Sequence, residues 1–269
     1  MPDSPAQPRL SATVLLVRDG AELEVLMVAR HYEIDFAAGA LVFPGGKCSG
    51  DDARPEWSAE VDGDYDGVDL TARIGAAREA FEETGILLAR PKSARGPGAP
   101  LIGEEVCDAL APFRAAVDRG ERSFLDLLRD NELVLALDSL VHFGHWITPE
   151  MMPKRFDTHF YVAPAPVEQI ARHDGRETTQ AVWLSPGDAL DQEAKGEATI
   201  IFPTRMNLRR LAMATSVRDA LKRFSADDVV TVLPVVSKMA DGEPCLVIPE
   251  VDGYGQTEEP LENLKGVAR

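Results

Sequence analysis

The sequence predicts an α/β protein in which helices flank both faces of a mixed β-sheet. Strand-like and helical segments interleave without the regular alternation of a parallel βαβ repeat, which favours mixed strand directions. The chain has 269 residues, of which 45% are hydrophobic, so it can bury a large core. No apolar run approaches the roughly 18 residues of a membrane helix. We therefore expect an α/β/α sandwich, organised as a single domain over residues 1–269 with no membrane segment.

The chain is expected to open with a β-hairpin. Residues 11–17 and 22–29 are apolar runs joined by an Asp-Gly pair, which favours a tight turn. Residues 41–43 predict a third strand. The Pro-Gly-Gly that follows breaks both helix and strand, so we expect a loop there.

An acidic segment and a helix come next. Residues 49–69 hold eight Asp or Glu against Arg54 alone, and most of the other side chains are small. We expect this segment to be an exposed insertion that is mobile without substrate. In residues 70–84 the apolar side chains recur at helical spacing, and Gly85 stands where a helix commonly ends in a left-handed residue.

The remaining elements are predicted from apolar runs and turn signals in the same way. Further strands are expected at residues 86–88, 139–147, 158–162 and 178–184. A loop is expected at residues 90–100, and one or two amphipathic helices at 107–130 lie within a helical insertion at 104–135. Residues 199–224 are expected to be helical after Pro203, residues 229–249 to form a hairpin-like pair, and residues 199–269 together to form a C-terminal extension packed on the core.

The charge of the chain bears on its partners. The formal net charge is -17, from 45 acidic and 28 basic side chains, so the chain repels polyanions and we expect no nucleic-acid partner. A small anionic substrate remains compatible if a bound divalent cation reverses the sign locally. The first ten residues lack the basic start and apolar stretch of a secretory signal, so we expect a cytoplasmic protein. The oligomeric state stays open, a homodimer being one option.

Neither the cysteines nor the histidines predict a metal cluster. Cys48, Cys107 and Cys245 are far apart and odd in number, which fits reduced thiols. His142 and His145 are an odd number of residues apart on a predicted strand, so we expect them on opposite faces of the sheet. A metal site that both share is therefore not expected.

Three carboxylates are concentrated at the end of the helix predicted at 70–84. Glu79 lies three and four residues before Glu82 and Glu83, so all three project from one helical face. Like charges this close repel one another unless a cation neutralises them, and hard oxygen ligands suit Mg²⁺ or Mn²⁺. The alternative is a solvated acidic face with no ligand.

A larger pattern surrounds these glutamates. Residues 78–86 run Arg-Glu-Ala-Phe-Glu-Glu-Thr-Gly-Ile, and Phe-Pro-Gly-Gly precedes them at residues 43–46. This combination resembles the Nudix box. The box begins with Gly, any five residues, Glu and any seven residues. It ends with Arg-Glu-apolar-any-Glu-Glu-any-Gly-apolar. The matching residues, in identity and order, are Gly46, Arg78, Glu79, Glu82, Glu83, Gly85 and Ile86. The resemblance implies a Nudix-type α/β/α sandwich with a metal-dependent diphosphate site.

The box is interrupted between its glycine and its arginine. Gly46 and Arg78 lie 32 positions apart where the pattern has 14, so residues 46–78 carry an insertion. Counting back from Arg78 puts Leu70 at the place of the first box glutamate, with Asp69 beside it, which leaves that counterpart open. We expect the insertion to shape substrate access rather than to supply main metal ligands. If it did supply one, an aspartate at position 66 or 69 would be the candidate.

A split box resembles one branch of the family, the coenzyme A diphosphatases of the mammalian peroxisomal type, and residues 155–163 and 174–186 also resemble that branch. A second sequence pattern is typical of Nudix proteins that act on coenzyme A, and Arg30 matches the arginine of that pattern. At three other positions, Val28, His31 and Asp35 replace the residues that the pattern requires. The resemblance implies hydrolysis of a nucleoside diphosphate derivative, with coenzyme A or acyl-coenzyme A expected. The alternatives are ADP-ribose or an NADH-type dinucleotide and, from another class, a non-catalytic ligand sensor.

The resemblance also implies residue roles. Glu79, Glu82 and Glu83 would hold Mg²⁺ or Mn²⁺ and would be catalytic, with Arg78 orienting a neighbouring carboxylate. Glu177 is expected either to be an extra ligand or base or to be an exposed acid at a strand end. Arg155 would either hold a substrate phosphate or pair with Asp157. The substrate-binding residues are expected to be Arg30, Gly45, Gly46, Lys47 and Arg155.

Overall fold

The computed structural model describes residues 6–30 and 39–264. Its centre is one mixed sheet whose strands are β1 (Arg9–Asp19), β2 (Leu23–Arg30), β3 (Leu41–Val42), β4 (Gly45–Lys47), β7 (Val141–Ile147), β8 (Phe156–Pro164), β9 (Thr178–Leu184) and β10 (Thr231–Val232). The order is β10-β7-β8-β1-β2-β3, with β4 paired to β1 and β9 paired to β2. β1 runs parallel to β8 and antiparallel to β2. The hairpin at the start of the chain and the strands predicted at 139–147, 158–162 and 178–184 are confirmed.

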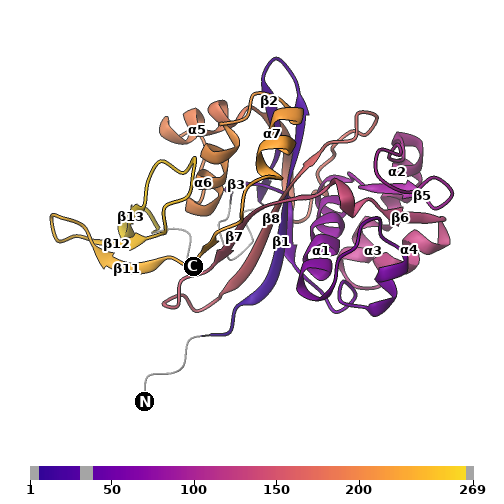
Figure 1. Cartoon of the computed structure of the whole chain (residues 1–269), viewed down its shortest axis with the longest axis horizontal. Coiled ribbons are helices and arrows are strands. Elements are labelled where there is room, and N and C mark those ends of the chain that lie inside the picture. The colour runs from indigo at the N-terminus through magenta and orange to yellow at the C-terminus, as the bar shows by residue number, and fades with distance from the viewer. Residues whose placement is uncertain (1–5, 31–38, 265–269) are drawn as a thin grey trace.

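Helices cover both faces of this sheet (Figure 1). On one face lies α1 (Gly67–Thr84), and on the other lie α5 (Pro186–Ala194), α6 (Phe202–Leu211) and α7 (Val217–Phe224). The predicted α/β/α sandwich is therefore confirmed. The helix expected at 70–84 begins three residues earlier, at Gly67, and ends at Gly85, whose φ of 75° is left-handed.

The two faces of the sheet differ in the size of the side chains that they bury. Toward α1, the alanines at every fourth position of the helix, Ala72, Ala76 and Ala80, pack with Val14 and Tyr161 of the sheet. These small residues allow α1 to lie close to β1 and β8. The opposite face buries larger side chains against α6 and α7, including Phe143, Trp146, Met206 and Phe224.

Two helices replace the one predicted at 199–224. The chain leaves the helix after Leu211 and starts again at Val217, where Ser216 accepts a hydrogen bond from the Asp219 backbone N–H. The helix α5 was not predicted, because its sequence is short and polar. Its signal was the N-cap Ser185, which accepts from the Asp188 N–H, followed by Pro186 at the first helical position.

The segment after α1 forms a helical layer of its own. It contains β5 (Ala89–Pro91), α2 (Glu104–Leu110), α3 (Arg114–Asp118), α4 (Phe124–Asp130) and β6 (Leu133–Leu135). The strand predicted at 86–88 is wrong, because β5 starts at Ala89, and the loop predicted at 90–100 loses its first two residues to that strand. The helices expected at 107–130 are present as three short helices that begin at Glu104. This layer packs against α1 on the side away from the sheet (Figure 1).

The acidic segment at 49–69 is largely exposed, as expected, but it is folded and buries Asp52, Trp57, Glu60, Val61 and Asp62. Trp57 is completely buried in a 3₁₀ turn at Pro55–Ala59, with its ring centroid 5.9 Å from that of Phe124. The two buried acids Glu60 and Asp62 are paired with cations from distant positions. Glu60 contacts Lys92 and Arg129, and Asp62 contacts Arg90 and Arg95. The sequence concealed this, because none of those cations lies within the segment.

Trp57→Ala should therefore lower the free energy of unfolding by about 3 to 5 kcal/mol, the usual cost of deleting a fully buried large aromatic side chain. Chemical denaturation measures the change. Trp183→Ala, at a half-buried position on β9, is the matched control and should cost less. Equal stability of Trp57→Ala and the parent protein would mean that the segment is as loose as its composition suggested.

A second, smaller sheet ends the described chain. Its strands are β11 (Val235–Lys238), β12 (Pro244–Val247) and β13 (Glu258–Pro260), and the first two form the hairpin predicted within 229–249. Tyr254 connects this region to the main core, since its hydroxyl accepts a hydrogen bond from Trp146 Nε1 at 2.9 Å. Among the described residues, the structure has no helix that is both long and apolar enough to span a membrane.

Candidate active site

Three glutamates from the last two turns of α1 form the centre of the candidate site. Glu79, Glu82 and Glu83 are all buried. Glu83 is fixed by the sheet, because its Oε2 accepts a hydrogen bond of 3.0 Å from the Gly45 backbone N–H. The three carboxylates thus lie where the end of α1 meets β4, and a solvated acidic face is excluded.

The two glycines of the Phe-Pro-Gly-Gly segment belong to a strand, which corrects the expectation of a loop. Gly45 and Gly46 lie in β4, opposite Thr13 and Ala12 of β1. A Cβ atom on Gly45 would lie 2.5 Å from Thr13 Oγ1, and one on Gly46 would lie 2.6 Å from the Glu79 carboxyl group. Glycine is required here because backbone and carboxylates approach too closely for any side chain.

Gly46→Ala should lower kcat by about 100-fold, because the added methyl group must displace the Glu79 carboxylate, and a shift of about 1 Å in a reacting group has an effect of that order. Gly50→Ala is the matched control, since a Cβ at Gly50 meets nothing within 4 Å. Steady-state kinetics on both variants measure the difference. Two variants with the same kcat would show that the position of Glu79 does not matter for turnover.

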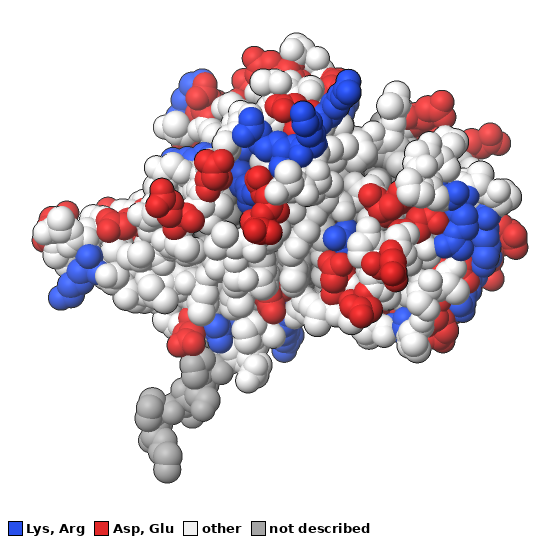
Figure 2. Space-filling view, in the orientation of Figure 1, with Lys and Arg blue, Asp and Glu red and all other residues white. Residues whose placement is uncertain are grey.

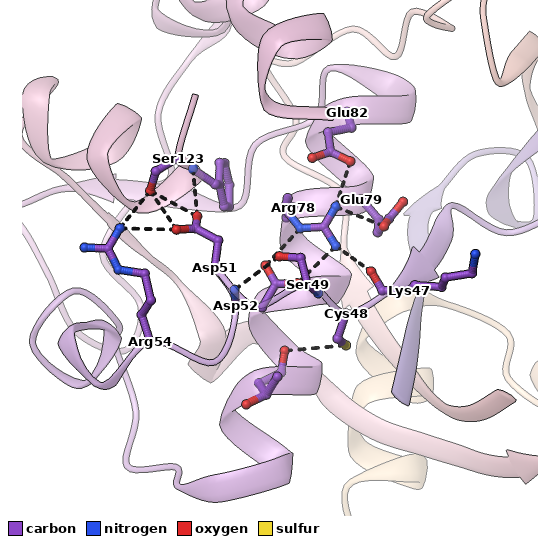
Figure 3. Close-up of polar contacts among 12 residues, drawn as sticks. Lys47, Cys48, Ser49, Asp51, Asp52, Arg54, Arg78, Glu79, Glu82 and Ser123 are labelled. Atoms are coloured by element: carbon purple, nitrogen blue, oxygen red, sulfur yellow. Dashed lines mark hydrogen bonds and ion pairs between the residues drawn. The ribbon is translucent and has the colours of Figure 1, made fainter. Parts of the chain in front are cut away.

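A single guanidinium holds the carboxylates together (Figure 3). Arg78 binds Asp52 through two hydrogen bonds, Nε to Oδ1 at 2.9 Å and Nη2 to Oδ2 at 3.0 Å. Its Nη1 lies 2.7 Å from Glu82 Oε2 and 3.0 Å from Glu79 Oε1. Its Nη2 also donates to the Lys47 carbonyl at 2.8 Å. The planar fork of the arginine therefore links α1, β4 and the insertion in one network.

Asp52 is a member of this network that sequence reasoning missed. Its side chain is fully buried and pairs with Arg78. Counted forward from Gly46, five residues lead to position 52, the place of the first box glutamate, so the insertion follows this position instead of preceding it. Asp52 therefore takes the place that the sequence left open at Leu70 and Asp69. Asp69 lies at the other end of α1, where it pairs with Arg73.

The site carries more negative than positive charge. Burial raises the pKa of Glu79 above the usual range of a glutamate, against the opposing charge of Arg78. Burial raises the pKa of Glu82 in the same way, and the charge of Glu79 adds to this. Glu82 Oε1 is buried and has no hydrogen-bond partner among the described residues. An excess of buried carboxylate oxygens, one of them unpartnered, fits a divalent cation with oxygen ligands.

The other predicted site residues are distributed unevenly. Glu177, at the start of β9, is exposed, and its charge reaches Glu79, whose pKa it raises. The Lys47 side chain is exposed and extends away from Arg78 (Figure 3). Arg30 ends β2 beside Thr178, but its side chain lies outside the described residues, as do His31 and Asp35.

The contacts of Arg155 are to the backbone and not to Asp157. Its guanidinium donates to the backbone carbonyls of Thr148 at 3.0 Å and Ala6 at 2.9 Å. Asp157 contacts His145 instead of Arg155. Through these two bonds Arg155 links Ala6, which precedes β1, and Thr148, which follows β7, to the start of β8, and neither bond involves the three glutamates.

Two cavities border the carboxylates. One, of about 150 Å³, is lined by Glu82, Arg114 and Arg176 among others. The other, of about 300 Å³, is lined by Arg78 and Arg122 among others. Asp118 of α3 lines both cavities. The helical layer thus supplies walls and arginines next to the carboxylates, and its arginines could not be assigned from sequence because no local pattern marks them.

His142 and His145 lie on the same face of the sheet, which corrects the expectation of opposite faces. The register of β7 against β8 shifts between His142 and Gly144, as in a β-bulge. The extra residue reverses the alternation, so Phe143 and Trp146 both enter the opposite core. The two histidines then stack on His159, with ring centroids 5.1 and 4.3 Å away.

The fold and the site define a Nudix hydrolase. A family model described as NUDT19 Nudix domain matches residues 59–211, and the chain belongs to this family. The human protein named acyl-coenzyme A diphosphatase NUDT19 is 33% identical over 211 residues, 73% of this chain and 54% of that protein. The Gallus gallus protein of that name is 28% identical over 268 residues, 82% of this chain and 70% of that protein. The chain spans about half the length of the human relative.

A solved structure agrees with these relatives. The crystal structure of a NUDIX hydrolase from Alicyclobacillus acidocaldarius has a TM-score of 0.70 and 27% sequence identity, and the match covers 83% of this chain and 99% of that chain. Because nearly the whole of that chain is matched, the two proteins share the overall fold. Nudix hydrolases generally need a divalent metal ion, in agreement with the carboxylate-rich site.

Proposed function

We propose that this protein hydrolyses the diphosphate bond of coenzyme A or an acyl-coenzyme A in a reaction that depends on Mg²⁺ or Mn²⁺. The observation that carries the proposal is the set of buried carboxylates around Arg78, with Glu82 Oε1 unpartnered beside a cavity. Buried charges persist when they are paired or bind metal, and the single charge of Arg78 faces three acids, Asp52, Glu79 and Glu82.

Glu79, Glu82 and Glu83 would hold the metal. When bound, Mg²⁺ or Mn²⁺ would neutralise charge on the diphosphate and acidify a water molecule. The chain's own residues set the geometry: the Gly45 N–H orients Glu83, and Arg78 orients Glu79 and Glu82. Glu177, whose charge acts on Glu79, is the candidate to accept the proton of the attacking water.

The substrate class rests on the relatives and on local charge. The human and Gallus gallus relatives carry the name acyl-coenzyme A diphosphatase. Arg114, Arg122 and Arg176 line the two cavities, where they can meet phosphate groups of an anionic substrate. Elsewhere, acidic and basic side chains are interspersed on the face shown in Figure 2, in line with a net charge of -17 and a small-molecule partner.

A substrate panel tests the proposal. Coenzyme A, acyl-coenzyme A, ADP-ribose and NADH are incubated with the protein and Mg²⁺ or Mn²⁺, and the products are resolved by chromatography. We expect coenzyme A or acyl-coenzyme A to give the highest kcat/KM. A preference for ADP-ribose or NADH would overturn the substrate assignment, and binding of a ligand without hydrolysis would favour a sensor.

The metal-free protein should lose stability as the pH rises from about 5 to about 8. Glu79 and Glu82 have higher pKa values when folded than the value of about 4.3 of an unfolded glutamate. Their contribution to stability is thus complete below the unfolded pKa and is lost as the pH rises through the folded pKa. Melting curves in EDTA at both pH values test this, with Glu82→Gln expected to show a smaller loss.

Millimolar Mg²⁺ should restore much of the lost stability at pH 8, because it binds the folded state preferentially. The metal-free parent could instead have equal melting temperatures at both pH values and gain nothing from Mg²⁺. That result would contradict the claim that the buried carboxylates need a cation.

A further inference from the structure

A second group of potential ligands lies on the sheet, apart from the glutamates. His145 of β7 is directly opposite His159 of β8, and Asp157 is two residues before His159 on the same strand face. One ligand atom from each of these three side chains lies within 4.8 Å of the others. All three side chains are only partly buried, so an ion can reach them from solvent.

This group is separate from the diphosphate site. Tyr161 lies two residues after His159 on the same face of β8, and its hydroxyl donates a hydrogen bond to Asp69 in the first turn of α1. Ala12 of β1 pairs with His159 on one side and with Gly46, which lies beside Glu79, on the other. Two strand spacings, about 10 Å, therefore separate His159 from Gly46. The two sets of ligands therefore cannot share one ion.

Hydrogen bonds orient both imidazoles toward the aspartate. His145 Nδ1 lies 2.8 Å from Thr231 Oγ1, and His159 Nδ1 lies 3.2 Å from His142 Nε2. The Nε2 atoms of His145 and His159 face Asp157 Oδ1, at 2.5 and 3.9 Å. An imidazole that binds metal through one nitrogen usually has the other nitrogen held in this way.

We propose that His145, Asp157 and His159 form a binding site for a transition-metal ion of the Zn²⁺ type. Two imidazoles and a carboxylate suit Zn²⁺, whereas Mg²⁺ prefers oxygen ligands alone. Binding at about 2.0 to 2.2 Å from each atom requires only small side-chain movements from the observed separations. The proton shared by His145 and Asp157 would leave to solvent. The ion would tie β7 to β8 next to β10.

Calorimetric titration with Zn²⁺ in excess Mg²⁺ tests the site. The parent protein should bind one equivalent of Zn²⁺. The double variant His145→Asn, His159→Asn should bind Zn²⁺ at least about 100-fold more weakly. Thr231→Val, which removes only the orienting contact, should weaken binding about 10-fold. His173→Asn, an exposed histidine outside the group, is the matched control and should bind as the parent does.

The double variant Glu82→Gln, Glu83→Gln separates this site from the diphosphate site and should keep the Zn²⁺ equivalent. If the histidine double variant does not fold, Asp157→Asn, at a position one-third exposed, removes one ligand with less disturbance. Loss of the Zn²⁺ equivalent in the glutamate variant, or its retention in the histidine and aspartate variants, would overturn the proposal. So would a parent protein that binds no Zn²⁺.

Discussion

Glu82→Gln should lower kcat by at least about 100-fold and should also raise the melting temperature of the metal-free protein at pH 8. The loss of rate corresponds to removing one key electrostatic contact. The gain in stability follows from burial, which disfavours the charged form of Glu82 and raises its pKa. An amide keeps the shape of the side chain without the charge. Opposite effects on activity and stability are expected where a site is built to bind a cation.

Glu83→Gln should lower kcat by a similar factor, because it removes a charge that the Gly45 N–H positions. Glu105→Gln, an exposed glutamate of α2, is the matched control and should leave kcat and melting temperature unchanged. Steady-state kinetics and thermal unfolding in EDTA give both quantities. Parent-like turnover in Glu82→Gln and Glu83→Gln would refute the assignment of the site.

Asp52→Ala should have the opposite effect on stability. It removes the bidentate partner of Arg78 and leaves a buried guanidinium less well paired, which typically costs about 3 to 5 kcal/mol. The change should also lower kcat, because Arg78 positions Glu79 and Glu82. Denaturant unfolding and steady-state kinetics measure the two effects.

Asp66→Ala is the control within the same insertion. Asp66 is exposed at the start of α1 and makes no side-chain cap bond, so this variant should remain close to the parent in both measurements. If Asp66→Ala instead abolished hydrolysis while Asp52→Ala did not, an insertion aspartate would have to bind the metal, and the role given to Asp52 would be wrong.

The catalytic helix could be predicted because its signals are local. The spacing of its apolar residues, the left-handed Gly85 and the three glutamates all fall within one short segment. The insertion could not be predicted, because the partners of its acids are remote in sequence. Asp62 pairs with Arg90 and Arg95, and the burial of Trp57 depends on Phe124. Composition alone therefore indicates the exposure of the segment but not the few side chains that tertiary contacts bury.

Two outcomes depend on counting along the chain. Counting back from Arg78 leaves the first box glutamate without a clear counterpart, whereas counting forward from Gly46 leads to Asp52. The faces of His142 and His145 were assigned by strict alternation, which a single extra residue in β7 reverses. Such irregularities depend on the register with a neighbouring strand, which one sequence does not contain.

Mn²⁺ binding followed by electron paramagnetic resonance, in parallel with hydrolysis of coenzyme A on the same samples, tests the central claim most directly. We predict that bound Mn²⁺ and the hydrolysis rate saturate over the same concentration range in the parent protein. Both should be lost in a folded Glu79→Gln, Glu82→Gln, Glu83→Gln variant. Hydrolysis that persists in EDTA, or that survives in the triple variant, would contradict metal-dependent catalysis by the carboxylates of α1.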